Sequence, residues 1–518
     1  MSPPSVASPA APQAPHFASI PPAAAHLNGH GGGPASSPST PSPSTSPAFN
    51  LQALLDARHD DLLDLHARTI NPAVVGVLKT IGFDARYTHG RGAYLFDDQG
   101  RRYIDCLGGY AVFAAGRNHP VIREAIKQAL DMDLPNLPGV GLFRTAGLLA
   151  EKLLSLAPSG LKPSEGGWGK VFFASGGGEA VDAAIKMARI ATGRARIIYC
   201  HRSYHGLTVG GLSVTGNHEF RDGFGPLLAD TQEIPFSDLP ALEQALASSQ
   251  AAAFIVEPIQ GKGVNIPHAD YLASAAALCK KHGTLLILDE IQTGLGRTGR
   301  WWAAEHDGMG TRWAPDMLVT AKALSGGIAP TSAVLSTDAV HAKVFPGMAQ
   351  SAKIQNTFAM NDVSMAAGLA ALHVIEHEGL RANAAAVGEY LTSGLRAAIG
   401  QMEMVKEVRG RGLMIAIEFQ RPRSLSLKLG WDMLHKLDPN LFCQAVVMPL
   451  MSDHRILTQV AGYRLDVIKL IPPLVLTRTD ADEIIAGFKA CVGACHTFPG
   501  PAWEVGTKLT KAAARRLV

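Results

Sequence analysis

Residues 285 to 299 read LLILDEIQTGLGRTG, and the two halves of this stretch predict different folds. The second half, Gly294 to Gly299, matches the dinucleotide-binding pattern G-x-G-x-x-G. The first half is a short apolar run that ends at Asp289 and Glu290, as a buried strand of an α/β sheet does. A dinucleotide site needs its first glycine directly after the strand and a helix directly after the third, but Asp289 to Thr293 intervene and Arg300-Trp301-Trp302 follow. The strand end therefore carries the chemistry, and the glycines are interpreted as a loop.

The composition is that of a soluble globular protein. The chain has 518 residues, of which 47% are hydrophobic and 18% are charged, enough for two or three packed domains. Its formal charge of +3 indicates neither a nucleic-acid partner nor a membrane surface, and no apolar run reaches the roughly 18 residues of a membrane span. Six cysteines are too few for a disulfide framework in a chain of this size. We expect a soluble, cytoplasmic protein.

The first 50 residues differ from the rest of the chain. They are rich in Pro, Ser and Ala and contain no Asp, Glu, Lys or Arg, so we expect a disordered tail. The tail lacks the apolar core of a signal peptide and the arginines of a mitochondrial presequence. We expect residues 51–115 to form an N-terminal helix and a hairpin of a small domain, 116–378 a large domain, and 379–518 the C-terminal part of the small domain.

Short apolar runs alternate with helical stretches from about residue 140 to residue 340. The runs are 171–173, 197–199, 253–256, 285–288, 317–319 and 333–335. Continuous apolar runs separated by helices indicate parallel strands that are buried on both faces. Beyond residue 375, an Ala-rich helical stretch precedes two strand-like runs at 413–417 and 467–476. The predicted fold class is α/β, with a mostly parallel central sheet in the large domain and a small α+β domain built from the N- and C-terminal segments.

Ligands of such sheets bind at the carboxyl ends of the strands. The turn Gly176-Gly177-Gly178 follows one strand and opens a helix, which is typical of a phosphate site, although taken alone the motif fits a flexible turn equally well. Glu257 and Asp289 end two further strands, and Lys322 follows a fourth, although a lone lysine there could also simply reach solvent. Together these groups match the needs of pyridoxal phosphate: a phosphate anchor, an anion for the ring nitrogen and an amine for a Schiff base.

A metal site is not expected. Cys200, His201 and His205 lie close together in the sequence, but Ser203, Tyr204 and Gly206 indicate a loop, so the spacing argument that applies on a helix does not hold.

From about residue 90 to residue 490 the sequence resembles the class III pyridoxal-phosphate-dependent aminotransferases of the aspartate aminotransferase fold, fold type I. The motifs that carry the resemblance are 172–184, Tyr204-His205-Gly206, 257–261, 289–294, 322–327, Asn356-Thr357-Phe358, 409–413 and Pro472-Pro473-Leu474. This order of motifs is highly specific. The resemblance implies pyridoxal 5'-phosphate as cofactor and a ping-pong exchange of amino groups.

The resemblance also implies roles for individual residues. Lys322 would form the Schiff base, and Asp289 would pair with the ring nitrogen. The remaining cofactor-binding positions would be Gly177 and Gly178 at the phosphate, Tyr204 on the ring, Gln292 near the ring hydroxyl, and Glu257. Thr357 would complete the phosphate site of a partner subunit, which implies a homodimer with shared active sites.

Three positions bear on the substrate. Amino-acid-specific members of the family carry a glutamate and an arginine where this chain has Lys262 and Lys469, and lysine lacks the bidentate fork of arginine. Tyr110 falls where ornithine-type members place a substrate-contacting tyrosine, so the resemblance is to the ornithine/putrescine-type subgroup and implies a long substrate chain with a distal amine. We expect an aminotransferase for a terminal amine, aldehyde or ketone with an amino acid as the other substrate. The alternatives are an aminomutase or decarboxylase on the same fold, or an inactive cofactor-binding scaffold.

Overall fold

The computed structural model describes residues 49–137, 141–161, 169–439, 441–462, 465–500 and 503. Nearly all of the tail that the sequence predicts to be disordered, residues 1–50, lies outside the described residues. The chain divides into two units, residues 1–65 and 66–518.

The first unit contains helix α1 (Leu51–Ala57) and a single turn of 3-10 helix, η1 (His59–Asp61), and α2 (Leu62–Thr69) begins in it. One continuous helix was expected here, but the backbone leaves helical geometry at Arg58, where φ is −118°. The polar run from Arg58 to Asp61 interrupts the apolar spacing at this point.

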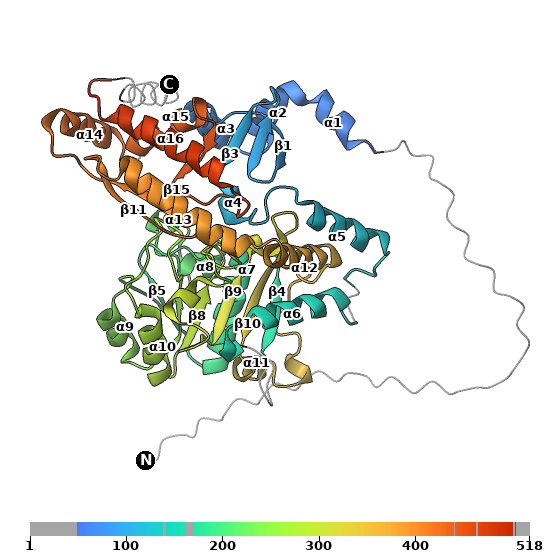
Figure 1. Ribbon diagram of the computed structural model, residues 1–518. Coiled ribbons are helices and arrows are strands. Elements are labelled where there is room, and N and C mark those ends of the chain that lie inside the picture. Colours follow the sequence, from blue (N-terminus) through green and yellow to red (C-terminus); the bar gives the residue numbers. More distant parts are fainter. Residues whose placement is uncertain are drawn as a thin grey trace, which may run out of the picture. The chain divides into compact units, whose positions relative to one another are not determined.

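A seven-stranded sheet lies at the centre of the second unit (Figure 1). Its strand order is β4-β10-β9-β8-β7-β5-β6. The strands are β4 (Lys170–Ala174), β5 (Arg196–Cys200), β6 (Thr231–Ile234), β7 (Ala251–Val256), β8 (Leu285–Asp289), β9 (Met317–Thr320) and β10 (Ser332–Ser336). All pairings among β5 to β9 are parallel. The prediction of a mostly parallel central sheet is therefore confirmed.

Two details of this sheet differ from the prediction. Strand β10 runs antiparallel to both of its neighbours, β4 and β9, because the link from Thr320 to Ser332 carries no helix that could cross over the sheet. Strand β6 was missed, since its sequence Thr-Gln-Glu-Ile has only one large apolar side chain. The pattern of apolar residues indicates neither the direction of a strand such as β10 nor a polar strand such as β6.

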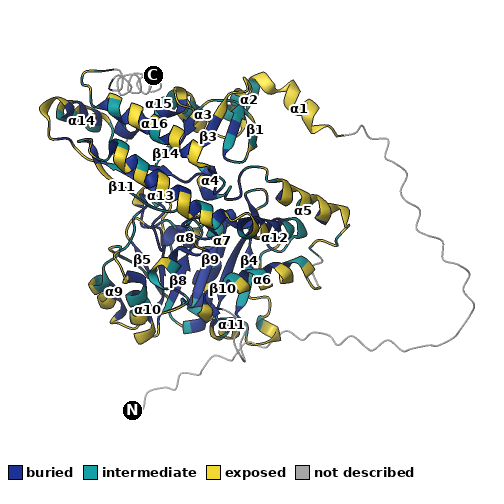
Figure 2. Cartoon of the chain, viewed as in Figure 1, coloured by how far each residue is buried: buried dark blue, intermediate teal, exposed yellow. Residues whose placement is uncertain are grey.

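The large sheet is buried on both faces (Figure 2). In β8, Leu286 and Leu288 belong to one hydrophobic cluster and Ile287 to another, because successive side chains of a strand point to opposite faces. Helix α7 (Gly177–Thr192) covers one face, and α6 (Arg144–Leu156) and α12 (Asp362–His377) contribute to the core on the other. The remaining helices of this region are α5 (Pro120–Asp131), α8 (Val209–Ser213), α9 (Leu239–Leu246), α10 (Tyr271–Lys281) and α11 (Asp338–Val344).

Two four-stranded sheets also lie in the described part of the second unit. One has the order β1-β2-β3-β13 and joins the N-terminal strands β1 (Tyr87–Arg91), β2 (Tyr94–Asp97) and β3 (Arg102–Asp105) to β13 (Ile456–Leu457). The other has the order β11-β12-β15-β14 and consists of β11 (Val405–Arg411), β12 (Met414–Phe419), β15 (Val467–Leu470) and β14 (Gln459–Val460). Segments far apart in the chain thus share a sheet. The α+β region built from both ends of the chain is confirmed, while its exact boundaries stay a prediction.

Six helices accompany these sheets. They are α3 (Pro72–Ile81), α4 (Gly108–Ala111), α13 (Leu380–Ile399), α14 (Leu425–Leu437), α15 (Leu441–Ser452) and α16 (Arg478–Cys495), of which α4 is a single turn with positive φ angles. The predicted hairpin corresponds to β2 and β3, which pair antiparallel. The strand expected over 467–476 ends at Leu470, because Pro472 and Pro473 follow and proline has no amide to donate to a ladder. No helix within the described ranges is long and apolar enough to cross a membrane.

Candidate active site

A cavity of about 1080 Å³ lies at the carboxyl ends of the central strands. Its lining includes ten of the eleven residues that the sequence singled out, and these are Tyr110, Gly177, Gly178, Tyr204, Glu257, Lys262, Asp289, Gln292, Lys322 and Lys469. The eleventh, Thr357, is exposed and does not line the cavity of its own chain. The sheet thus brings together groups that are up to 359 residues apart in the sequence.

The first wall of the cavity is the turn between β4 and α7. Gly177 and Gly178 are the first two residues of α7, so their amides lack acceptors within the helix. The carboxylate of Glu179 accepts from the amides of Ser175 (2.9 Å) and Gly176 (3.3 Å) and so fixes the turn. Such a helix start attracts an anion through its free amides and its dipole.

A second turn closes over this one at Gly206. The φ of Gly206 is +109°, and a Cβ there would lie 2.9 Å from the Cα of Gly178. Thr208 extends the contact, since its hydroxyl bonds to the Gly178 carbonyl (3.2 Å) and to Asp182 Oδ1 (2.9 Å). Only glycine permits this approach of two backbones around the anion-binding turn.

Asp289 faces the cavity from the end of β8. It is 3% exposed, its Oδ2 lies 2.7 Å from Nδ1 of His205, and its Oδ1 accepts from the Ile291 amide at 3.0 Å. The remaining nitrogen of the buried His205 ring, Nε2, has no partner among the described residues. His205 therefore holds the carboxylate in one orientation.

Glu290 points to the opposite face of the strand, as the alternation of side chains requires. Its carboxylate accepts from the amides of Ala303 (3.1 Å) and Ala304 (2.9 Å), and burial raises its pKa to about 7. The glycines that follow form the predicted loop: a Cβ at Gly294 would lie 2.9 Å from the ring of Trp302. The segment from Gly294 to Gly299 therefore has a structural role.

Glu257 connects two loops of the site. Its Oε2 accepts from the Tyr204 amide (3.0 Å) and its Oε1 from the Gly261 amide (2.8 Å). Burial raises its pKa to about 7, an effect that Asp289 strengthens and His205 and the two amides oppose. Glu257 thus positions Tyr204 and the segment that carries Lys262.

Lys322 enters the cavity from the turn after β9. Its φ is +34°, an unusual value for a residue with a side chain, and such backbone strain is concentrated at functional sites. Desolvation lowers the pKa of its ammonium, and the carboxylates of Asp289 and Glu257 oppose that shift. A lysine in these surroundings has a larger neutral fraction than one in water.

The opposite wall begins at a strained turn. Gly108, Gly109, Tyr110 and Ala111 have φ values of 54°, 59°, 62° and 77°. Gln292 Nε2 donates to the Tyr110 carbonyl at 3.1 Å and so ties this turn to the segment after β8. Tyr110 is 56% exposed and lines the cavity.

Two lysines occupy the same wall. Lys469 is 4% exposed and donates to the carbonyl of Gly261 (2.9 Å) and to Gln292 Oε1 (3.3 Å). Desolvation lowers its pKa to about 7, and the positive charges of Lys322 and Lys262 add to the shift. The Lys262 ammonium lies 4.5 Å from the ring centroid of Phe220 and 5.9 Å from that of Tyr204, and burial lowers its pKa. Neither lysine forms a salt bridge within the described part of the chain.

The surroundings fit pyridoxal phosphate. Anion-binding amides, an aromatic side chain, a buried carboxylate and a lysine line one cavity. Thr331, which also lines it, has a buried hydroxyl without a partner among the described residues, so an anion near the α7 turn would find a further donor there. The pairing of these groups with particular atoms of the cofactor stays a prediction.

Sequence reasoning missed three residues of the site: His205, Phe220 and Thr331. His205 was visible in the Tyr204-His205-Gly206 motif, but only the fold shows that its ring meets Asp289. Phe220 packs edge-on against Tyr204, with ring centroids 5.5 Å apart, and nothing in its sequence context indicates that contact. Thr331 follows a glycine-rich turn without any motif of its own.

Fold and site together are those of an α/β enzyme that depends on pyridoxal phosphate. The family model of the class III aminotransferases matches residues 79–492, and the chain belongs to this family. The predictions of family, fold type I, cofactor and aminotransferase function are therefore confirmed.

Individual relatives agree with this assignment. The chain is 33% identical over 495 residues to the aminotransferase PigE of a Serratia species, covering 89% of this chain but only 57% of that protein. It is 35% identical over 412 residues to ornithine aminotransferase 1 of Staphylococcus aureus, covering 78% of this chain and 93% of that one. Among solved structures, ornithine aminotransferase from Toxoplasma gondii superposes with a TM-score of 0.73 at 30% identity, covering 87% of this chain and 99% of that one. An amine transaminase from an uncultivated Pseudomonas species gives 0.67 at 30% identity, covering 79% and 95%.

Proposed function

We propose that this aminotransferase exchanges an amino group between an α-amino acid and a terminal amine or aldehyde on a largely apolar chain. The observation that carries the proposal is the lysine pair, Lys262 and Lys469, on the substrate wall of the cavity. The names of relatives support the general chemistry, since they include ornithine aminotransferases and an amine transaminase.

When bound, pyridoxal phosphate supplies a ring that accepts the electron pair left behind when a proton leaves the substrate carbon. Asp289 would keep a proton on the ring nitrogen, because its buried carboxylate stabilises a positive charge opposite it. His205 fixes that carboxylate from behind through the 2.7 Å contact. An Asp289 carboxylate that was free to rotate would bind a cationic partner less selectively than one that His205 holds in place.

Lys322 would act as the base that moves the proton. Its Nζ is desolvated, which lowers the pKa and raises the fraction of neutral amine able to accept a proton from the substrate carbon. The same Nζ, once protonated, could give the proton back, because the side chain stays attached to the cavity wall. The strained turn after β9 restricts where that amine can lie.

The lysines determine which substrates suit the opposite wall. Lys262 and Lys469 both line the cavity, and neither forms a salt bridge with a carboxylate of the described residues. A substrate with a second ammonium group would be repelled there, whereas the carboxylate of an amino acid would be attracted. Lysine binds a carboxylate as a point charge, so this recognition tolerates different amino acids.

The rest of the lining accommodates an apolar chain. Val112, Phe220, Ile291, Ile328 and Val460 all line the cavity. A substrate chain without charges loses little by leaving water for such a surface. The second substrate that fits is therefore a neutral aldehyde or a monoamine with its reacting group at the end.

We also propose a homodimer in which Thr357 reaches the phosphate site of the partner subunit. Thr357 is exposed, and the neighbouring Asn356 donates to Glu179 Oε2 at 2.6 Å, so its segment is anchored at the α7 turn. Replacing Thr357 with Ala should weaken cofactor binding without changing the fold. A monomer in solution at assay concentration would contradict this part of the proposal.

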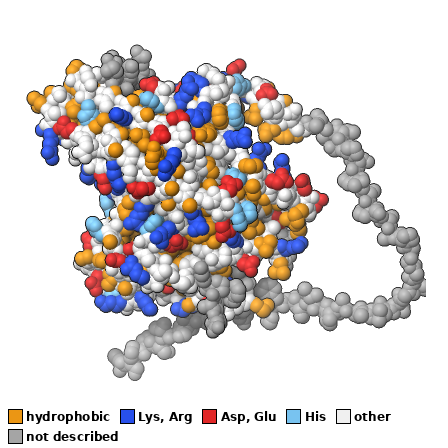
Figure 3. Space-filling view, viewed as in Figure 1, with side chains coloured by type: hydrophobic (Ala, Val, Ile, Leu, Met, Phe, Trp, Pro, Cys, Tyr) orange, Lys and Arg blue, Asp and Glu red, His pale blue; other side chains and the backbone are white. Residues whose placement is uncertain are grey.

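We infer a cytoplasmic location and no nucleic-acid partner. All six cysteines are free and buried, which suits a reducing compartment. On the face drawn in Figure 3, basic and acidic side chains are interspersed over the described residues, and a nucleic-acid site would need a field of one sign.

A half-reaction screen tests the substrate class. Cofactor-loaded enzyme is mixed with amino acids, linear monoamines and diamines of equal length, and the change of cofactor absorbance to that of its amine form is followed. Amino acids and apolar monoamines should convert the cofactor, and the diamine should do so with a lower kcat/KM than the matched monoamine. A preference for the diamine would contradict the role given to the lysines.

A further inference from the structure

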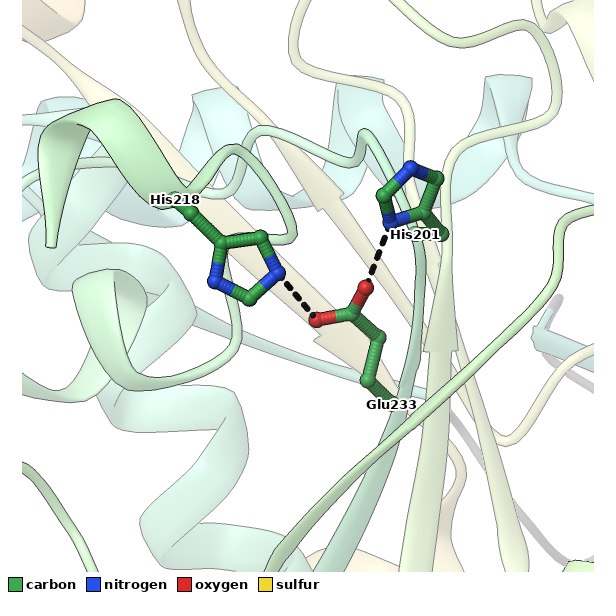
Figure 4. A group of neighbouring side chains, drawn as sticks. All are labelled: His201, His218 and Glu233. Atoms are coloured by element: carbon green, nitrogen blue, oxygen red, sulfur yellow. Dashed lines mark hydrogen bonds and ion pairs between the residues drawn. The ribbon is translucent and has the colours of Figure 1, made fainter.

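Three side chains outside the cavity meet at the edge of the large sheet: His201, His218 and Glu233 (Figure 4). His201 Nδ1 lies 2.6 Å from Glu233 Oε1, and His218 Nε2 lies 3.3 Å from Glu233 Oε2. One ligand atom from each residue lies within 4.8 Å of the other two. Neither the cofactor nor the substrate chemistry uses this cluster.

The three residues come from different elements. His201 directly follows β5, Glu233 lies in β6, and His218 is the first residue of the 3-10 turn η3 (His218–Phe220). The main chain of His201 is fixed on two sides, since its amide donates to the Ile234 carbonyl (2.7 Å) and its carbonyl accepts from Gln260 Nε2 (2.7 Å). His201 and Glu233 are thus held by the sheet, and His218 lies on a surface turn.

Two imidazoles and a carboxylate form a suitable donor set for a divalent transition metal ion. At metal–ligand distances of about 2.0–2.2 Å, neighbouring ligand atoms of a tetrahedral site are roughly 3.3–3.6 Å apart, so a small rotation of these side chains suffices. His201 and His218 are about half exposed or more, which gives an ion access and leaves room for water as the remaining ligand. The combination that the sequence suggested and rejected, with Cys200 and His205, is different: Cys200 is buried and His205 contacts Asp289.

Two charged side chains, Arg221 and Glu219, lie near the three candidate ligands. Arg221 Nη1 donates to the hydroxyl of Tyr199 (2.6 Å), whose residue pairs with Glu233 across β5 and β6. That guanidinium has its own partner, and the carboxylate of Glu219 lies in the same turn as His218. A divalent ion would replace two histidine contacts to Glu233 by three stronger bonds.

The turn that carries His218 also carries part of the cavity wall. Phe220 lies at its other end, lines the cavity, and contacts the ring of Tyr204 and the ammonium of Lys262. Holding His218 against β5 and β6 would restrict this turn. An ion bound at the sheet edge would therefore also fix the position of Phe220.

We propose that His201, His218 and Glu233 form a site for one divalent transition metal ion of the zinc type. The ion links the η3 turn to the edge of the large sheet and so steadies the Phe220 side of the cavity. This site is separate from the chemistry at Lys322, so its test does not depend on turnover.

The test uses untagged, cofactor-loaded protein from which metals have been removed with a chelator. Zn²⁺ is titrated against a chromophoric chelator to obtain affinity and stoichiometry, and Co²⁺ is used for its visible spectrum. The variants are His201→Ala, His218→Ala and the isosteric Glu233→Gln. The matched control is His373→Ala with His377→Ala, another exposed histidine pair whose ring centroids lie 4.2 Å apart on α12. Retained cofactor absorbance and circular dichroism verify folding.

We expect one Zn²⁺ per chain and a loss of affinity of at least about tenfold in each single variant, since even loss of an outer-shell partner costs 10–100-fold. The control variant should bind like the wild type. Hydrogen exchange of residues 216–224 should slow on addition of Zn²⁺ in the wild type and not in His218→Ala. Unchanged affinity in the three variants, or loss only in the control, would overturn the site. Binding with unchanged exchange would overturn the linking role.

Discussion

The two walls of the cavity are built in different ways. The cofactor wall consists of strand ends: Asp289 closes β8, Glu257 follows β7, and Lys322 follows β9. The substrate wall consists of turns from distant segments, with Tyr110 on a left-handed turn, Lys262 in a loop and Lys469 in β15 of the smaller sheet. A parallel sheet places the first set together by its own geometry, whereas the second set depends on how the sheets and loops pack. The sheet thus places the residues that we propose to hold the cofactor, and the turns and loops around it place those that we propose to select the substrate.

The largest effect is expected on the cofactor wall, from Lys322→Ala. Without the amine, the base that moves the proton is missing, so kcat should fall by more than about 10³-fold. The visible absorbance of cofactor attached to the protein should disappear as well. Stopped-flow absorbance and turnover measurements check both, and Lys322→Arg serves as a control that keeps the charge. Turnover within tenfold of the wild type would contradict the assignment of Lys322.

Asp289 and Glu290 allow a matched comparison of neighbouring buried acids. Asp289→Asn should lower kcat by roughly 10²–10⁴-fold, because a neutral amide cannot stabilise a protonated ring nitrogen. Glu290→Gln should leave kcat nearly unchanged and reduce the free energy of unfolding by about 1–3 kcal/mol, since Glu290 only accepts hydrogen bonds from a loop. Steady-state kinetics and thermal unfolding separate the two. Equal losses of kcat would contradict the separate roles given to the two acids.

A smaller effect is expected on the substrate wall, from Lys469. Its pKa is lowered to about 7, so the charged form that attracts a carboxylate is present below that pH and lost above it. The ratio of kcat/KM for an amino acid to that for a monoamine should fall by about tenfold between pH 6 and pH 8. Titration of Lys322 affects both substrates and cancels in the ratio. In Lys469→Met the ratio should depend on pH much less than in the wild type, and the remaining dependence should come from Glu257, whose pKa is also about 7. A wild-type ratio that is flat with pH would exclude this role.

Lys262→Met should give the smallest change. Its ammonium would attract the carboxylate of an amino acid by about 0.5–1 kcal/mol, so KM for the amino acid should rise about two- to fivefold when the charge is removed. The KM for a monoamine should stay the same or fall, because one positive charge has left the wall. A larger rise in KM for the monoamine than for the amino acid would contradict the role proposed for Lys262.

Much of the cofactor wall could be predicted from the sequence. Apolar runs of four or five residues identify strands, and the residue at a strand end lies at the edge where ligands bind, so Asp289 and Lys322 could be placed without a structure. The orientation of Asp289 against Glu290 followed from the alternation of side chains along a strand. Strand β6 escaped because its polar sequence gives no such pattern.

The substrate wall could not be derived in this way. Tyr110, Lys262 and Lys469 were singled out by resemblance, and their common cavity depends on contacts such as that of Gln292 with the Tyr110 carbonyl. The partner of Asp289, the His205 ring, depends on a loop closing over the phosphate turn at Gly206. Phe220 lies on a short turn whose position depends on packing and not on periodicity. Long-range contacts of this kind leave no local pattern.

The most direct test of the account is a nitrogen balance over one complete exchange. Cofactor-loaded enzyme is incubated with ¹⁵N-labelled alanine and an apolar linear aldehyde, and product amine, keto acid and carbon dioxide are measured together. We predict ¹⁵N in the terminal amine in equal amounts to the keto acid formed, with no carbon dioxide released. Carbon dioxide release, an amino group moved within one molecule, or no labelled amine at all would contradict the proposed exchange.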